Sequence, residues 1–176
     1  MKKFYKDILP YIIIVVSVVI IRSFIITPVV VRGDSMDDTL EDGQVLFLSK
    51  ISYRVHDIKR FDIVVIKDID DDLIIKRVIG LPGDDVKYED NKLYINDKLV
   101  KDKYANGETG DFTLQNICEI NNDDCVAKIP DDMYLALGDN REVSADSRVK
   151  GLFSRKQILG KATLRIWPLN KIKIVK

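Results

Sequence analysis

The stretch LIIKRVIG, residues 73–80, places two adjacent cations, Lys76 and Arg77, inside an otherwise aliphatic run. A short run of Leu, Ile and Val bounded by turn residues predicts a β-strand. Successive side chains of a strand point to opposite faces, so the two cations project to opposite sides. An ammonium group among aliphatic side chains is costly unless it is neutral or paired, and a neutral amine is a base. An edge strand with both cations in water is the alternative interpretation.

Short apolar runs on either side of this stretch predict a mostly β domain. The acidic run Asp70–Asp72 predicts a hairpin between strands at 61–66 and 73–79. Ser154 as a cap and Gly160 as a stop predict a short helix over 154–159. We expect a core of residues 29–84 and 130–170, with residues 85–129 mounted on it as a smaller β insertion. The remaining strands are expected at 24–31, 44–49, 86–88, 92–95, 99–100, 134–137 and 162–167.

Residues 8–27 form an apolar stretch of membrane length, about 30 Å as a helix. Lysines dominate the segment before it and acidic residues the segment after it. Positive charge stays on the cytoplasmic side, which predicts a cytoplasmic tail (1–7), a transmembrane anchor (8–27) and an extracytoplasmic domain (28–176). The first alanine of the chain is Ala105, so no small-residue cleavage site follows the stretch and we expect the anchor to stay. A buried core helix is the alternative.

Composition narrows the classes of function. The 28 basic and 28 acidic residues of the 176-residue chain balance, so no global field favours nucleic acid as a partner. One histidine and two cysteines argue against a typical zinc site, and we expect no metal or cofactor. Cys118 and Cys125 are close enough in sequence to form a disulfide on the outer face, with free thiols as the alternative.

A candidate nucleophile, Ser35, lies in GDSMDDTL, residues 33–40, just beyond the predicted anchor. A serine needs a base to attack a carbonyl, and Ser–Lys pairing is one recurring solution, which makes Lys76 the candidate base. Gly33 permits a close backbone approach, and amides in such a turn can point at a developing oxyanion. Ser35 as a helix cap alone is the competing interpretation.

A third polar stretch, GDNREVSADSR at residues 138–148, is rich in hydroxyls and opposite charges. Asp146 and Arg148 can pair across a turn, and Ser144 can hydrogen-bond near a lysine amine. A solvated loop without function is the alternative.

These stretches, together with RFDIVV (60–65), KRVIGLPGD (76–84) and RIWPL (165–169), resemble the signature segments of the bacterial type I signal peptidases, and they occur in the same order. The resemblance implies Ser35 as nucleophile and Lys76 as general base. It also implies that Ser144 holds the lysine amine and that Asp146 and Arg148 brace the loop. Gly33 and Asp34 complete the supporting set.

Two positions depart from the family pattern. Gly33 stands where some relatives carry a hydroxyl, so we expect the oxyanion to be held by backbone amides alone, that of Ser35 included. Asp38 stands where the family usually has proline, which is expected to loosen the turn after the nucleophile.

The resemblance implies a mostly β signal-peptidase-like fold behind a single transmembrane helix in the cell membrane. The implied enzyme is a serine endopeptidase that removes signal peptides from exported preproteins after small residues of the A-x-A type. Its partners would be these signal peptides, membrane lipid and, indirectly, the export machinery. A catalytically weak or inactive membrane-tethered relative that binds peptides is the alternative.

Overall fold

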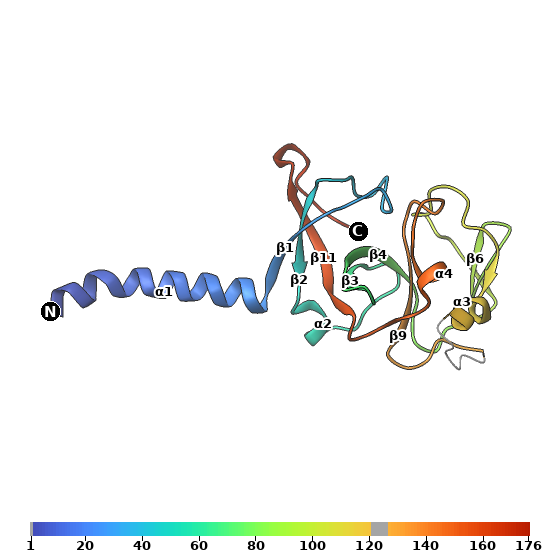
Figure 1. Cartoon of the computed structure of the whole chain (residues 1–176), viewed down its shortest axis with the longest axis horizontal. Helices are drawn as coiled ribbons and strands as arrows, with labels where there is room; N and C mark the ends of the chain where they lie inside the picture. Colours follow the sequence, from blue (N-terminus) through green and yellow to red (C-terminus); the bar gives the residue numbers. More distant parts are fainter. Residues whose placement is uncertain (1, 121–126) are drawn as a thin grey trace.

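The computed structural model describes residues 2–120 and 127–176. A helix, α1 (Lys2–Phe24), leads away from a β-rich body, and β1 (Ile26–Val30) connects the two (Figure 1). The helix therefore ends before the predicted anchor does, because Ile26 and Thr27 already pair with β2. In the described part of the chain, no helix combines the length and the apolar character needed to cross a membrane. A membrane-spanning role for residues 8–27 stays a prediction.

The main sheet confirms the mostly β core. Its strands follow the order β1-β2-β11-β3-β4-β9-β10, each antiparallel to its neighbours, and β12 pairs with β11. Most of its strands coincide with the runs of β-branched residues in the sequence. Their bounds are β2 (Val45–Ser49), β3 (Ile63–Lys67), β4 (Leu73–Gly80), β9 (Met133–Leu137), β10 (Phe153–Ser154), β11 (Ile158–Trp167) and β12 (Lys173–Ile174).

The predicted hairpin is present as β3 and β4, with Val64 opposite Lys76. Strand β4 also pairs with β9, though only from Arg77 to Gly80, so it is not an edge strand over its whole length. Lys76 is 3% exposed and Arg77 is fully buried. The edge-strand interpretation with both cations in water is therefore wrong.

The insertion forms a second sheet of its own, in the order β7-β6-β5-β8. Its elements are β5 (Val86–Glu89), β6 (Lys92–Ile95), β7 (Lys98–Val100), β8 (Phe112–Thr113) and the following helix α3 (Leu114–Ile120). This sheet and α3 lie at the end of the body opposite α1 (Figure 1). One apolar core joins the two sheets, since Ile79 and Leu135 pack in the same buried cluster as Val86 and Leu93.

The helix predicted over 154–159 is wrong. Ser154 ends β10, Ile158 begins β11, and residues 155–157 form the turn between them. The amide and hydroxyl of Ser154 both donate to Gln157 Oε1, at 2.8 and 2.9 Å, so the polar spacing that suggested a helix start closes a turn instead. The short helices are α2 (Ser52–Val55), α4 (Ser147–Lys150) and the 3₁₀ turn η1 (Leu169–Lys171).

Cys118 lies buried on α3 and is disulfide-bonded. Cys125 lies outside the described residues, so the pairing of Cys118 with Cys125 stays a prediction.

Candidate active site

Ser35 and Lys76 meet, although 41 positions separate them. Ser35 lies in the loop after β1, and Lys76 projects from the middle of β4. Lys76 Nζ donates a hydrogen bond of 2.7 Å to Ser35 Oγ. Ser35 is partly exposed whereas Lys76 is buried, so the serine lies nearer the surface than the lysine.

Burial also sets the protonation of this amine. Burial lowers the pKa of Lys76 to about 8, Asp146 opposes the shift, and the cations Lys150 and Arg148 add to it. In the described part of the chain, no carboxylate forms an ion pair with Lys76 that would keep it charged. At mildly alkaline pH a large fraction of the amine is therefore neutral and able to accept the serine proton.

Asp146 and Arg148 contact each other at the end of the polar loop, residues 138–148. Asp146 is fully buried, and Arg148 Nε and Nη2 donate to its two carboxylate oxygens at 2.9 Å each. The same carboxylate caps α4 and accepts the amide of Gly138 at 3.0 Å. A buried carboxylate with this many donors fixes the start and the end of the loop relative to each other.

Gly138 allows this loop to lie close against Ser35. A Cβ atom at residue 138 would lie 2.4 Å from Ser35 O and 2.2 Å from Ser144 Oγ. The amide of Asn140 donates to Ser35 O at 3.1 Å. Only a residue without a side chain allows the backbone to approach Ser35 this closely.

Ser144 lies at this contact, but it does not hold the lysine amine in this structure. Among the described residues, its buried Oγ has no hydrogen-bond partner. A buried hydroxyl without a partner costs about 1–3 kcal/mol, so Ser144 carries unused hydrogen-bonding capacity close to Ser35.

The residues that precede Ser35 shape its loop. Gly33 has φ +75°, a left-handed conformation that favours glycine, and its amide donates to Asp42 Oδ1 at 2.8 Å. Asp34 is exposed and its carbonyl accepts the amide of Asp37 at 3.1 Å. Asp38 is exposed, and its carboxylate accepts a hydrogen bond from Asn106 Nδ2 at 3.2 Å. Its charge is thus directed toward the insertion.

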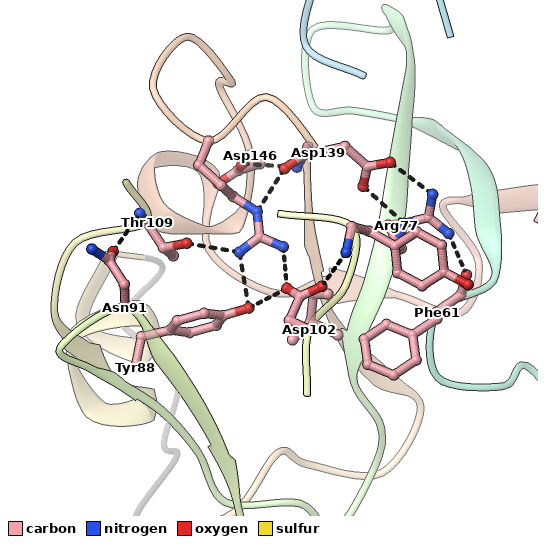
Figure 2. Close-up of polar contacts among 12 residues, drawn as sticks. Phe61, Arg77, Tyr88, Asn91, Asp102, Thr109, Asp139 and Asp146 are labelled. Atoms are coloured by element: carbon pink, nitrogen blue, oxygen red, sulfur yellow. Dashed lines mark hydrogen bonds and ion pairs between the residues drawn. The ribbon is translucent and has the colours of Figure 1, made fainter. Parts of the chain in front are cut away.

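Sequence reasoning missed a buried ion pair next to the candidate base. Arg77 Nε and Nη2 donate to the two carboxylate oxygens of Asp139 at 2.8 and 2.7 Å, and Arg77 Nη1 donates to Phe61 O at 2.9 Å (Figure 2). Thr39, four residues after Ser35, also donates to Asp139 at 2.5 Å. Asp139 thereby joins the loop, β4 and the turn after Ser35. Both charges are present in the motifs, but only the three-dimensional pairing of β4 with β9 shows that they meet.

Comparison with known proteins shows which family this chain resembles in sequence and structure. The family model described as "Signal peptidase, peptidase S26" matches residues 2–167. The chain is 39% identical over 181 residues to signal peptidase IB of Staphylococcus aureus (strain COL), covering 96% of this chain and 94% of the relative. It is 39% identical over 171 residues to signal peptidase I of Bacillus caldolyticus, covering 92% and 91%. The crystal structure of a signal peptidase I from Enterococcus faecalis V583 matches with a TM-score of 0.55 and 34% identity, covering 62% of this chain and 99% of that one.

Proposed function

Because this chain belongs to the signal peptidase family, peptidase S26, we propose that Ser35 and Lys76 are the catalytic dyad with which it cleaves signal peptides from exported preproteins. The chain has signal peptidase I function and is a serine endopeptidase, a hydrolase. The observation that carries the proposed dyad is the 2.7 Å hydrogen bond between a buried lysine amine and a partly exposed serine hydroxyl.

The proposed reaction proceeds through an acyl-enzyme. Neutral Lys76 takes the proton from Ser35 Oγ, and the oxygen attacks the scissile carbonyl carbon. The amide of Ser35 donates no hydrogen bond within the described part of the chain, so it is available to the oxyanion. Protonated Lys76 then gives its proton to the leaving amine. A water molecule, deprotonated by the same amine, hydrolyses the ester and restores Ser35.

The substrate is proposed to lie along β4. Strand β9 pairs with β4 only from Arg77 to Gly80, so in the described residues Leu73–Lys76 has no strand on that side. An extended peptide can add to such an edge through backbone hydrogen bonds, which would bring its scissile bond toward Lys76 and Ser35. Cleavage after small residues of the A-x-A type is part of this proposal.

Tethering by residues 8–27 to the cell membrane, with the N-terminus cytoplasmic, is part of the same proposal. The apolar side chains of Leu9, Tyr11, Val15 and Val19 on α1 are all more than half exposed. An exposed apolar surface of this kind is costly in water, and a lipid environment would cover it. The proposed partners are signal peptides, membrane lipid and, indirectly, the export machinery.

Cleavage of a preprotein by the full chain in detergent tests the dyad. Ser35→Ala and Lys76→Ala should each lower kcat/KM by at least about 1,000-fold, because nucleophile and base act as one unit. Lys92→Ala, which removes an exposed lysine of the second sheet, is the matched control and should keep wild-type activity.

Activity retained by Lys76→Ala would contradict the assigned base. A wild-type chain that neither cleaves a preprotein nor reacts at Ser35 with a serine-directed acylating probe would favour the inactive peptide-binding relative instead.

A further inference from the structure

Besides Arg77 on β4, an arginine of the loop at 138–148 is buried. The insertion supplies its side-chain partners. Arg141 is 1% exposed. It forms an ion pair with Asp102, and its Nη1 donates to Tyr88 Oη and Thr109 Oγ1 at 2.9 Å each. Tyr88 in turn donates to Asp102 Oδ2 at 2.6 Å. Tyr88, Asp102 and Thr109 converge on one guanidinium group in Figure 2.

Arg141 connects these residues to the nucleophile. Its Nε donates to Gly138 O at 2.9 Å. Gly138 is the residue whose backbone lies against Ser35 O and whose amide Asp146 accepts. A continuous series of contacts therefore runs from Asp102 through Arg141 and Gly138 to Ser35.

The segment around Asp102 touches the active-site elements at further points. We call residues 102–109 the bridging segment. Asn106 accepts the amide of Arg141 and donates its own amide to Asp139 O, both at 2.8 Å. Arg148 Nη1 donates to Thr109 O at 3.0 Å, and the guanidinium of Arg77 lies 3.6 Å from the ring centre of Tyr104. The bridging segment thus contacts the loop, β4 and, through Asn106, Asp38.

The charge of Asp102 is maintained despite its burial. Burial alone would raise the pKa of Asp102, but Arg141 and the hydroxyl of Tyr88 outweigh it and lower the pKa below its usual value. The Asp102 carboxylate is therefore ionised and neutralises Arg141. Replacement by a neutral side chain would leave a buried cation without its counter-ion.

We propose that Asp102 is a positioning residue for catalysis: through Arg141 it holds Gly138 against Ser35 and keeps the nucleophile in reach of Lys76. The insertion then contributes to the active site, because its bridging segment carries the residue that positions Ser35. This inference rests on the proposed dyad of Ser35 and Lys76.

Asp102→Asn in the full chain tests the proposal, with kcat and KM measured well below the unfolding temperature of each variant. We expect kcat to fall at least about tenfold with KM changed less than about twofold, because the substrate site is intact while the nucleophile is displaced. Glu89→Gln makes the same chemical change at an exposed carboxylate of the insertion. Ile95→Ala removes a buried side chain from the core of the insertion at a position that pairs with Val86 and Lys98 rather than with Tyr88. Both controls should keep wild-type kcat.

Hydrogen exchange at the amide of Asn140, which donates to Ser35 O, gives a readout that does not depend on activity. Its exchange should be faster in Asp102→Asn than in the wild type and unchanged in Glu89→Gln. If Asp102→Asn does not fold, Tyr88→Phe decides, since it keeps the ion pair between Arg141 and Asp102 and removes the two hydrogen bonds that the Tyr88 hydroxyl forms with them; a severalfold lower kcat is expected.

Wild-type kcat in a folded Asp102→Asn, an equal loss in Ile95→Ala, or unchanged exchange at Asn140 would overturn the positioning role. In the event that Asp102→Asn does not fold, wild-type kcat in Tyr88→Phe would overturn it as well. Failure of the proposed function has a different signature: an inactive wild type, or an active Ser35→Ala. The exchange measurement still decides the positioning role in that case.

Discussion

Two neighbouring cations, Lys76 and Arg77, are both buried, yet their partners give them different chemistry. Arg77 binds the Asp139 carboxylate through two hydrogen bonds, so its charge is compensated. Lys76 has the neutral hydroxyl of Ser35 as its hydrogen-bond partner, and burial lowers its pKa to about 8. Alternation along the strand predicted that the two side chains separate, but it could not predict Asp139, which follows 62 residues later. The difference in partner compensates the charge of Arg77 and leaves Lys76 able to act as the proposed base.

Burial of Lys76 has a consequence for stability that depends on pH. Its pKa is about 8 in the folded chain against 10.5 as the ordinary value, so below pH 8 the fold must bury a charged amine. Between pH 8 and 10.5 the unfolded chain binds more protons than the folded one, so stability rises with pH. The difference corresponds to about 3 kcal/mol. Lys76→Met should therefore be more stable than the wild type at pH 7, and the wild type should gain on it toward pH 10.

Thermal unfolding of both chains in detergent at pH 7 and pH 10 measures this effect, with Lys92→Met as the control for loss of an exposed lysine. A gap between wild type and Lys76→Met that stays constant from pH 7 to pH 10 would show that Lys76 is not buried as a titrating amine.

Elements were predictable where the pattern is local. The β3–β4 hairpin followed from two apolar runs and an acidic turn, and the second sheet followed from short runs at close spacing. The prediction of a helix over 154–159 is wrong because Ser154, which was expected to cap it, hydrogen-bonds Gln157 and closes a turn. Helix α4 was missed, although Asp146 is a residue type that caps helices. Signals for caps and turns overlap, and only the pairing of Ile158 with Ile66 decides between them here.

The contact between the loop at 138–148 and the loop of Ser35 gives the prediction at this scale. Gly138→Ala would place a Cβ 2.4 Å from Ser35 O, so one backbone must move. We expect kcat to fall by about 100-fold, since a displacement of roughly 1 Å at the reacting groups has effects of that size. Gly160→Ala is a matched control, because its Cβ would meet Ser49 O at the same 2.4 Å in β11, a strand that carries none of the candidate site residues.

Preprotein cleavage and thermal unfolding are measured on both glycine variants. Gly160→Ala should lose stability and keep its kcat, whereas Gly138→Ala should lose kcat. Equal kcat in the two variants would show that the fit of Gly138 against Ser35 does not matter for the reaction.

At the scale of the whole molecule, the fold assembles one site from four distant parts of the chain. The motifs predicted three of these parts: the loop of Ser35, the strand of Lys76 and the loop at 138–148. The fourth, the bridging segment, was not predictable, because a polar stretch with buried charges has the same composition as a solvated one. Asp102 and Thr109 look like surface residues in the sequence, yet Thr109 and the side chain of Asp102 are buried where they bind Arg141.

The relation of α1 to the body gives the last prediction. None of the described residues of α1 belongs to the three apolar clusters that form the core, and the side chains from Ile8 to Val19 are exposed. Deletion of residues 2–24 should therefore leave the β body folded. The rate at which it cleaves a short soluble peptide should stay within about threefold of the wild-type rate. Processing of a preprotein inserted in lipid vesicles should fall at least about tenfold, because tethering raises the effective concentration of enzyme at the membrane. Equal loss on both substrates would mean that α1 supports the fold, and equal retention would mean that it contributes nothing to reaching the substrate.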